Sequence, residues 1–289
     1  IEYEIYLSKD FLYKDSISTR VYKTTENLIK IDEDLDLGTY YWKVVAVKDG
    51  LKCDGFNSKN KFDLRKGSPI NGIIYADTVL NKMGSPYRIE DSLAIAKNAI
   101  VNVEPGTVIL MGENAKIKVQ GGFNLLGENE NPIIVKPLIP SSYFHSIYYY
   151  SSRYTNEIAH TKIYEGLLNS KYSTIKLNHV DFEIENRPMQ FGDRRPAVIW
   201  TWHGEIYIDQ ISISGNKMGE GININWSKAQ MSNSTIKNAP DAIEYINVSD
   251  GLITGNYVYN SPDDAIDLNG CKDVKISNNI IYNSADKGI

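Results

Sequence analysis

Apolar and polar positions recur with a period of 23 residues near the end of the chain. The segment 238–260 is followed at once by a near copy, 261–283, in which Ile243 recurs as Ile266. Both copies consist of short apolar runs separated by Asn, Asp and Gly. A fixed period in the low twenties with such runs is typical of a solenoid of stacked coils. A third copy is cut short at Ile289, so we expect the repeat to continue past this residue.

Earlier coils follow the same apolar pattern, which predicts stacks of buried side chains. Residues 175–182 match 206–213 at a spacing of 31, so this coil carries extra residues. Stacked strands lie about 4.8 Å apart, and each buried apolar side chain contributes about 1.5–3 kcal/mol. The alignment predicts two inward stacks: Ile208, Met231, Ile253 and Ile276, and Ile213, Ile236, Val258 and Ile281.

A further strand of each coil carries candidate binding residues. Successive side chains of a strand point to opposite faces, so four aligned apolar residues are predicted to point inward: Val198, Ile222, Ile243 and Ile266. The next position then points outward and holds Ile199, Asn223, Glu244 and Asp267, and two residues further on come Thr201, Asn225, Ile246 and Asn269. Asn223, Glu244 and Asp267 in the first of these rows are candidate substrate-binding residues.

Charged residues repeat at the corner before this strand. The aligned positions are Glu220, Asp241, Asp264 and Lys287, and the residues after them are small, which predicts an open corner: Gly221, Ala242, Ala265 and Gly288. Arg194 and Arg195 fall at the same corner in an earlier coil. One edge of the solenoid is therefore predicted to gather Asp241, Glu244, Asp263, Asp264 and Asp267 beside Arg194, Arg195 and Lys287.

Two chemistries and one purely structural role would each explain such a corner. Two carboxylates about 5 Å apart repel by about 3 kcal/mol at an effective dielectric of 20, which raises one pKa and can create a general acid beside a general base. A Ca²⁺ ion held by Asp241, Asp264 and Asp267 would relieve the same repulsion. Alternatively, Asp and Asn are turn formers that hydrogen-bond their own backbone, and repeated corners need repeated turn residues.

Aromatic residues offer a second kind of site. Trp202 and Trp226 lie 24 residues apart and are predicted to stack, either as a sugar platform or as a buried ladder. Tyrosines crowd residues 139–172, where no clear period is visible. We interpret this stretch as an insertion, a long loop or covering excursion, whose rings either stack on sugars or seal the solenoid.

The N-terminal residues 1–66 show a different pattern. Alternating runs at 3–7, 27–31, 39–47 and 61–64 read as strands between Asp-, Gly- and Asn-rich turns. The run 37–47 resembles the penultimate strand of a fibronectin type III domain. This resemblance implies a partial β-sandwich whose first strands precede Ile1, with a linker near 66–70.

From about residue 85 onward, the chain resembles right-handed parallel β-helix proteins of the pectate-lyase-like kind. The segments Val103-Glu-Pro-Gly-Thr-Val108 and Glu130-Asn-Pro-Ile-Ile-Val135 carry this resemblance. The predicted fold is therefore all-β: a partial fibronectin III-like β-sandwich over residues 1–66, then a right-handed parallel β-helix solenoid over 67–289.

The acidic corner is also similar to polygalacturonase-type glycosidase motifs. Asp241-Ala-Ile-Glu resembles the first element, Asn-Thr-Asp, and Asp263-Asp264 stands one coil later, like the second element, Asp-Asp. The resemblance implies acid and base roles for Asp241, Asp263 and Asp264. The chain departs from the pattern where Ala-Pro replaces Asn-Thr and Lys287 replaces a His. A polysaccharide lyase would instead use a basic residue, for which Arg194, Arg195 and Lys287 are candidates.

The composition of the chain argues against some classes of partner. The net charge of −5 argues against a general nucleic-acid-binding surface, and no run of about 18 apolar residues is present to span a membrane. The two cysteines, Cys53 and Cys271, fall in different predicted domains, which argues against a disulfide framework. Cys271 replaces Val248 one period later and is predicted to be a small buried hydrophobe.

These patterns predict a secreted or cell-surface module of a larger protein. Its β-helix would act as a glycan-engaging adhesive or structural scaffold, with a polysaccharide or cell-surface glycan as partner, and self-assembly or neighbouring domains as further partners. Predicted substrate-binding residues are Glu244, Asp267, Asn223, Arg194, Arg195, Lys287, Trp202 and Trp226. The alternative is a polysaccharide hydrolase or lyase that acts at the acidic corner. Fold similarity alone does not decide between them.

Overall fold

The computed structural model describes residues 1–14, 19–31, 35, 38–54, 60–64, 67–187 and 196–289. Two compact units divide the chain at Lys66, the first ending there and the second beginning at Gly67. Arg194 and Arg195, both predicted as binding residues, lie outside the described residues.

The first unit is an antiparallel sheet around one long strand. Its strands are β1 (Glu2–Ser8), β2 (Thr19–Thr24), β3 (Gly38–Lys48), β4 (Leu51–Asp54) and β5 (Asn60–Leu64). β1 pairs with β2 and β3, and the two halves of β3 pair separately with β5 and β4. Three of the predicted strands are present, at 3–7, 39–47 and 61–64. The second sheet that a fibronectin-like sandwich needs is not seen in the described part of this unit, so that resemblance stays a prediction.

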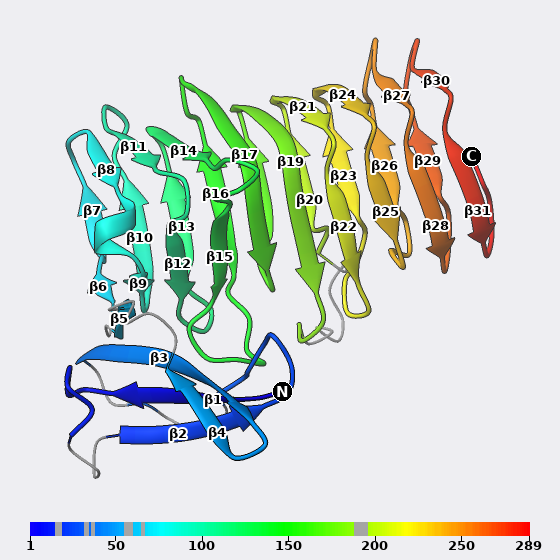
Figure 1. Ribbon diagram of the computed structural model, residues 1–289. Helices are drawn as coiled ribbons and strands as arrows, with labels where there is room; N and C mark the ends of the chain where they lie inside the picture. Colours follow the sequence, from blue (N-terminus) through cyan, green and yellow to red (C-terminus); the bar gives the residue numbers. More distant parts are fainter. Residues whose placement is uncertain (15–18, 32–34, 36–37, 55–59, 65–66, 188–195) are drawn as a thin grey trace. The chain divides into compact units, whose positions relative to one another are not determined.

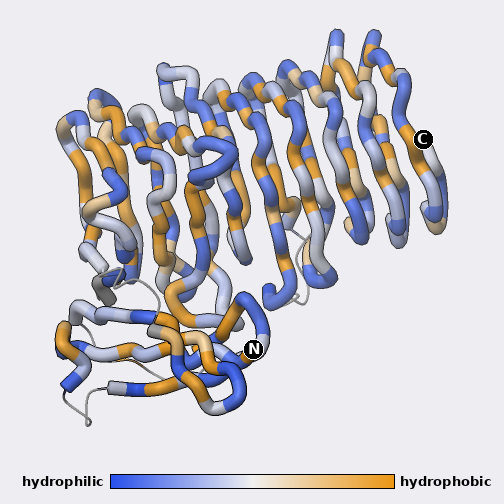
Figure 2. The backbone as a smooth tube through the Cα atoms, in the orientation of Figure 1, coloured by the Kyte–Doolittle hydropathy of each residue, from blue (hydrophilic) through white to orange (hydrophobic). Residues whose placement is uncertain are grey.

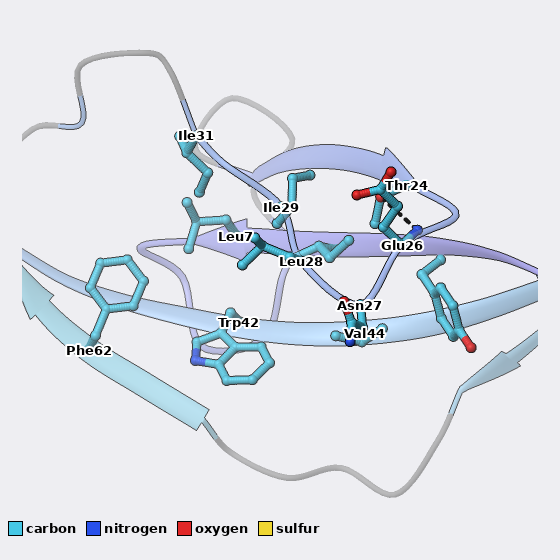
Figure 3. A pocket seen from close by; sticks show the side chains of 12 residues that line it. Leu7, Thr24, Glu26, Asn27, Leu28, Ile29, Ile31, Trp42, Val44 and Phe62 are labelled. Atoms are coloured by element: carbon cyan, nitrogen blue, oxygen red, sulfur yellow. Dashed lines mark hydrogen bonds between the residues drawn. The ribbon is translucent and has the colours of Figure 1, made fainter. Parts of the chain in front are cut away.

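Residues 27–31 form no strand, so this prediction is wrong. Their apolar side chains instead line a groove of about 470 Å³ over one face of the sheet, opposite Trp42 and Val44 (Figure 3). Leu28 is 75% exposed there. The alternating apolar residues of this segment therefore face the sheet without pairing with it. Sequence periodicity alone does not distinguish such a segment from a paired strand.

The second unit is a right-handed parallel β-helix. One nine-stranded sheet contains β7 (Gly72–Ile74), β10 (Ser92–Ile95), β13 (Lys116–Val119), β16 (Ser146–Tyr150), β18 (Leu167–Lys171), β20 (Ile199–Trp202), β23 (Ile222–Asn225), β26 (Ile243–Ile246) and β29 (Ile266–Asn269). Figure 1 shows these strands stacked in chain order, from β7 in cyan to β29 in orange. The predicted all-β solenoid fold is confirmed.

The other strands join a seventeen-stranded sheet that forms the rest of the wall. They are β6 (Ser68–Pro69), β8 (Thr78–Leu80), β9 (Tyr87–Ile89), β11 (Ile100–Val103), β12 (Val108–Met111), β14 (Gly122–Leu126), β15 (Ile133–Pro137), β17 (Thr155–Tyr164), β19 (Thr174–Ile184), β21 (Glu205–Asp209), β22 (Ser212–Gly215), β24 (Lys228–Ser232), β25 (Thr235–Lys237), β27 (Leu252–Thr254), β28 (Tyr257–Ser261), β30 (Lys275–Ser277) and β31 (Ile280–Ser284). A short 3₁₀ helix, η1 (Lys82–Gly84), lies before β9.

The interior is filled by the predicted apolar stacks. Ile243 pairs in register with Ile266, and Ile208 with Met231 in the next coil. The second predicted stack is also in register from β22 to β31. Hydrophobic and hydrophilic residues alternate along the strands in Figure 2. Because each inward side chain lies on its counterpart in the next coil, the stacks bury a continuous core along the solenoid.

Two sequence interpretations need correction. Residues 139–172 are not one covering excursion, since they contain the regular coil strands β16, β17 and β18. Tyr149 points into the core, fully buried, and its hydroxyl donates to the Phe123 carbonyl at 3.0 Å. A tyrosine can occupy an inward position of a coil when its ring is buried and its hydroxyl donates to a backbone carbonyl. Such a residue interrupts the apolar sequence pattern although the coil is regular.

The second correction concerns register at β20. Ile199, not Val198, pairs with Ile222, so Trp200 aligns with Asn223. Val198 and Ile199 are both fully buried. Because the two adjacent residues are both apolar and buried, the sequence fits either register. The two registers are distinguished only by the backbone pairing.

Asparagine side chains bond along the turns, as coil stacking requires. Asn256 Nδ2 donates to Asn279 Oδ1 at 2.9 Å, and Asn283 Nδ2 donates to Asn260 Oδ1 at 2.6 Å. Asn256 is buried and accepts the backbone N–H of Ser234 at 3.0 Å. These ladders satisfy backbone and side-chain polar groups at the corners and so stabilise the solenoid.

Candidate functional site

The predicted acidic corner is a ladder of backbone contacts between coils. Asp241 Oδ1 accepts the backbone N–H of Asp264 at 3.3 Å, and Asp264 Oδ1 accepts that of Lys287 at 2.9 Å. Each aspartate therefore binds the equivalent backbone position of the next coil. This geometry matches the turn-forming role that the sequence left open.

At Gly221, Ala242 and Ala265 the corner is not open, contrary to the prediction, whereas Gly288 is exposed. Ala242 and Ala265 are fully buried. A Cβ added to Gly221 would lie 2.5 Å from the Ala242 carbonyl oxygen. These residues are small because the adjacent coil approaches closely at this corner, and not because space is reserved for a ligand.

Charge at the corner is partly neutralised by Lys287. Its Nζ lies 3.2 Å from Asp264 Oδ2 and 3.2 Å from Asp286 Oδ2. Hydrogen bonds to Asp286 and Asp264 raise the pKa of Lys287. Because a raised pKa keeps the ammonium protonated at neutral pH, this side chain is poorly suited to the proton abstraction that a lyase needs.

The pKa of the Asp241 carboxyl group at this corner is raised above its ordinary value. Partial burial is the main cause of its raised pKa, and the charges of Asp263, Asp264 and Asp267 add to it, while the hydrogen bond from the Asp264 backbone opposes it. A carboxyl group with a raised pKa beside other carboxylates is one requirement of a general acid.

A different set of carboxylates converges than the predicted calcium ligands. In the described part of the chain, the ligand oxygens of Asp263, Asp264 and Asp286 lie within 4.8 Å of one another. The predicted set of Asp241, Asp264 and Asp267 does not form such a group there. Because the Lys287 ammonium already contacts two of the three converging carboxylates, the arrangement does not favour a calcium site.

The outer face of the nine-stranded sheet carries a groove of about 620 Å³. Strands β18, β20, β23, β26 and β29 supply most of its walls. Its lining is largely polar, with one large aromatic side chain: Asn169, Pro196, Ala197, Trp200, Glu220, Asn223, Asn225, Glu244, Ile246 and Asn269. We call this cavity the sheet groove.

Hydrogen bonds order the side chains of the sheet groove. Asn223 Nδ2 donates to Glu220 Oε2 at 2.8 Å and also to Glu244 Oε2. Asn225 Nδ2 donates to Asn223 Oδ1. Asn223 and Asn225 are each only 8% exposed, although they lie on the outer face of the sheet. Two carboxylates and two amides are thereby held in fixed positions next to the Trp200 ring.

Several predicted residues meet in this groove, whereas Trp200 and Asn169 were missed. Asn223 and Glu244 were both predicted, and Asp267 follows them in the same in-register row. Trp200 was missed because the predicted register placed Ile199 in its position. Asn169 was missed because its strand lay inside the supposed insertion, although Leu167 and Leu168 before it were a usable apolar signal.

The predicted stack of Trp202 on Trp226 is wrong. Trp202 pairs with Asn225, whereas His203 is the residue that stacks on Trp226, with ring centroids 5.8 Å apart. His203 also stacks on Tyr172 at 5.8 Å. The error again follows from the one-residue register shift at β20. A pocket of about 410 Å³ lies beside these rings.

Comparison with known proteins supports the fold. A family model described as a right handed beta helix region matches residues 192–289. No curated protein matches the chain, and neither does any solved structure. Together with the parallel coils of the structure, this match supports a right-handed β-helix region.

The described residues contain no helix that is long and apolar enough to cross a membrane. Cys53 and Cys271 both carry free thiols in this structure. Cys271 is half-buried against the core, and its thiol donates to the Tyr245 carbonyl at 3.1 Å. This supports its interpretation as a small packing residue.

Proposed function

We propose that this chain is the glycan-engaging β-helix module of a secreted or cell-surface protein, and that a saccharide binds in the sheet groove. The single observation that carries the proposal is the ordered set of Trp200, Asn223 and Glu244 in a cavity of about 620 Å³. Saccharide sites combine an apolar ring face with fixed polar groups that read hydroxyls.

Preorganisation supports binding at this place. Asn223 and Asn225 are fixed by their mutual hydrogen bond, so little side-chain entropy is lost when a ligand arrives. Amide and carboxylate groups can accept hydrogen bonds from sugar hydroxyls, and amides can also donate. The parallel backbone fixes the spacing of these groups along the solenoid, which suits an extended glycan lying across several coils.

A glycan array followed by isothermal titration calorimetry tests the proposal. The Trp200→Ala variant should bind the identified glycan at least about 10-fold more weakly, a loss of about 1.4 kcal/mol. Tyr282→Ala is the matched control, because Tyr282 is an exposed aromatic residue on the other sheet. The proposal fails if no glycan binds, or if both variants weaken binding equally.

The second candidate function is polysaccharide hydrolysis at the acidic corner. It is favoured by the raised pKa of Asp241 beside Asp263 and Asp264. Release of reducing sugar from a polysaccharide panel, lost in Asp264→Asn, would support hydrolysis and contradict a purely binding role. Binding without turnover would exclude it. Ultraviolet detection of unsaturated products distinguishes a lyase, which the protonated Lys287 disfavours.

The proposal also places the protein outside the cell or on its surface, where polysaccharides and cell-surface glycans are its partners. Self-association and contacts with neighbouring domains stay predictions. Cell fractionation with surface biotinylation of the native protein tests the location. Recovery of the protein only from the cytosol would contradict it.

A further inference from the structure

One turn position of the solenoid holds aromatic residues where other coils hold ordinary turn residues. The position follows the strands of the nine-stranded sheet and has positive φ in each of six successive coils: Ser151 (52°), Tyr172 (52°), His203 (48°), Trp226 (45°), Asn247 (51°) and Gly270 (64°). Backbone bonds keep it in register, for example from Trp226 N to Ile246 O at 2.9 Å. We call Tyr172, His203 and Trp226 the aromatic turn ladder.

The fold itself does not require rings at this position. Left-handed backbone is readily adopted by Gly and Asn, whereas bulky side chains are strained in it. Asn247 and Gly270 make the same turn without that strain. Three aromatic residues in succession are therefore an exception to local preference, and such exceptions concentrate at ligand-binding sites.

The rings are displayed to solvent rather than buried. Tyr172 is 45% exposed and Trp226 is 49% exposed. The Tyr172 and His203 rings are inclined by 15°, and the His203 and Trp226 rings by 22°, so the three form one stack. Trp202 supports the stack from the side, edge-on to His203 at 4.2 Å.

A polar pocket of about 410 Å³ adjoins this stack. Besides the three rings, its lining is Ser152, Ser173, Thr174, Gly204 and Glu205. Glu205 accepts the Tyr207 hydroxyl at 2.8 Å, and the Lys171 ammonium lies 5.2 Å from the centre of the Tyr172 ring. Both signs of charge are thus present beside an aromatic surface and hydroxyl groups, which suits a neutral ligand rich in hydroxyls and with an apolar face.

We propose that the aromatic turn ladder and its pocket form a second saccharide-binding site, specific for a neutral glycan. The site shares no lining residue with the sheet groove. It therefore goes beyond the proposed function and can hold or fail independently of it. A proline-rich peptide is the competing ligand for an exposed aromatic stack, and its binding is an outcome of the test.

Fluorine NMR of the full chain labelled with 5-fluorotryptophan separates the two sites. The chain has four tryptophans, so each resonance can be assigned by a single substitution. The Trp226 resonance reports the ladder, Trp200 reports the sheet groove, and Trp42 in the first unit is an internal control. The probes are neutral tetrasaccharides of glucose, galactose, mannose and N-acetylglucosamine, and a decaproline peptide.

We expect one tetrasaccharide to shift the Trp226 resonance saturably, which gives a dissociation constant for the ladder. Trp200→Ala should change this dissociation constant by no more than about 2-fold. Glu205→Gln should raise it at least about 10-fold, as loss of a charge-assisted hydrogen bond does, and should leave any Trp200 titration unchanged. Trp226→Asn, which installs the residue type of the next coil, should keep the circular dichroism spectrum. The double variant Trp200→Ala with Trp226→Asn should show no binding of the tetrasaccharide in calorimetry.

Other outcomes overturn the second site. If Trp200 titrates while Trp226 stays fixed, the ladder binds nothing and the proposed function stands. If Trp200→Ala abolishes the Trp226 shift, a single continuous site exists. If only decaproline shifts Trp226, the surface is a peptide site. If no tetrasaccharide shifts either resonance, the ladder proposal fails. If the glycan array also shows no binding, the proposed function fails as well.

Discussion

Truncation of Ile243 to alanine tests the interior of the solenoid most sharply. Ile243 is fully buried and lies in register between Ile222 and Ile266, which are also buried. An Ile→Ala change in such a site removes the apolar transfer energy and leaves a cavity, at a cost of about 2–5 kcal/mol. Neighbours on both sides are themselves fixed by stacking, so little collapse is available, and we expect a value of about 3 kcal/mol or more.

Urea denaturation followed by circular dichroism measures this loss, and hydrogen exchange of the β26 amides shows whether it is local to the second unit. The matched control is Ile280→Ala, because Ile280 is 61% exposed and exposed substitutions change stability by about 0.5 kcal/mol or less. If the two variants lose equal stability, Ile243 is not part of a buried stack and the packing argument is wrong.

Three further predictions concern polar groups. A hydrogen bond from Lys52 is the main cause that lowers the pKa of Glu4 to about 2. The ionised Glu4 should therefore contribute fully to the stability of the first unit above pH 4.5, and this contribution should be lost as the pH falls toward 2. Glu4→Gln should flatten that pH dependence of unfolding, and an unchanged slope would refute the pairing. Asn256→Ala should cost about 1–3 kcal/mol in urea denaturation, because it orphans a buried backbone N–H. Asn260→Ala, at an exposed ladder position, should cost less, and equal losses would contradict the distinction. Asp241→Asn keeps the acceptor oxygen but removes a carboxylate whose ionisation is opposed by burial, so thermal unfolding at pH 7 should occur at the same or higher temperature. A lower unfolding temperature would contradict the assigned cause.

The interior of the solenoid could be predicted from sequence because each inward position repeats with its own neighbour. Ile243 and Ile266 carry the same side chain, occupy equivalent places and stack directly. The outer face was harder to predict. Val198 and Ile199 are both buried, so periodicity does not choose between two registers, and a shift of one residue moved Trp200 out of the predicted site and placed Trp202 opposite Trp226.

Turn conformation was the other information that sequence lacked. Tyr172, His203 and Trp226 all occupy left-handed backbone that residue preferences assign to Gly or Asn. The Asp241 and Asp264 corner shows the opposite case. There the residue types matched their turn-forming preference, and the carboxylates that looked catalytic by spacing also bind backbone N–H groups of the next coil.

The measurement that tests the account most directly is a disulfide cross-link between successive coils. Glu244 and Asp267 are in-register partners on adjacent parallel strands, about 4.8 Å apart, within the Cα separation of about 4.4–6.8 Å that a disulfide spans. In a chain whose native cysteines are replaced, Glu244→Cys with Asp267→Cys should oxidise rapidly within one molecule. Glu244→Cys with Asn269→Cys, two residues out of register, should not. Preferential oxidation of the offset pair, or of neither, would contradict the stacked coils on which every site described above depends.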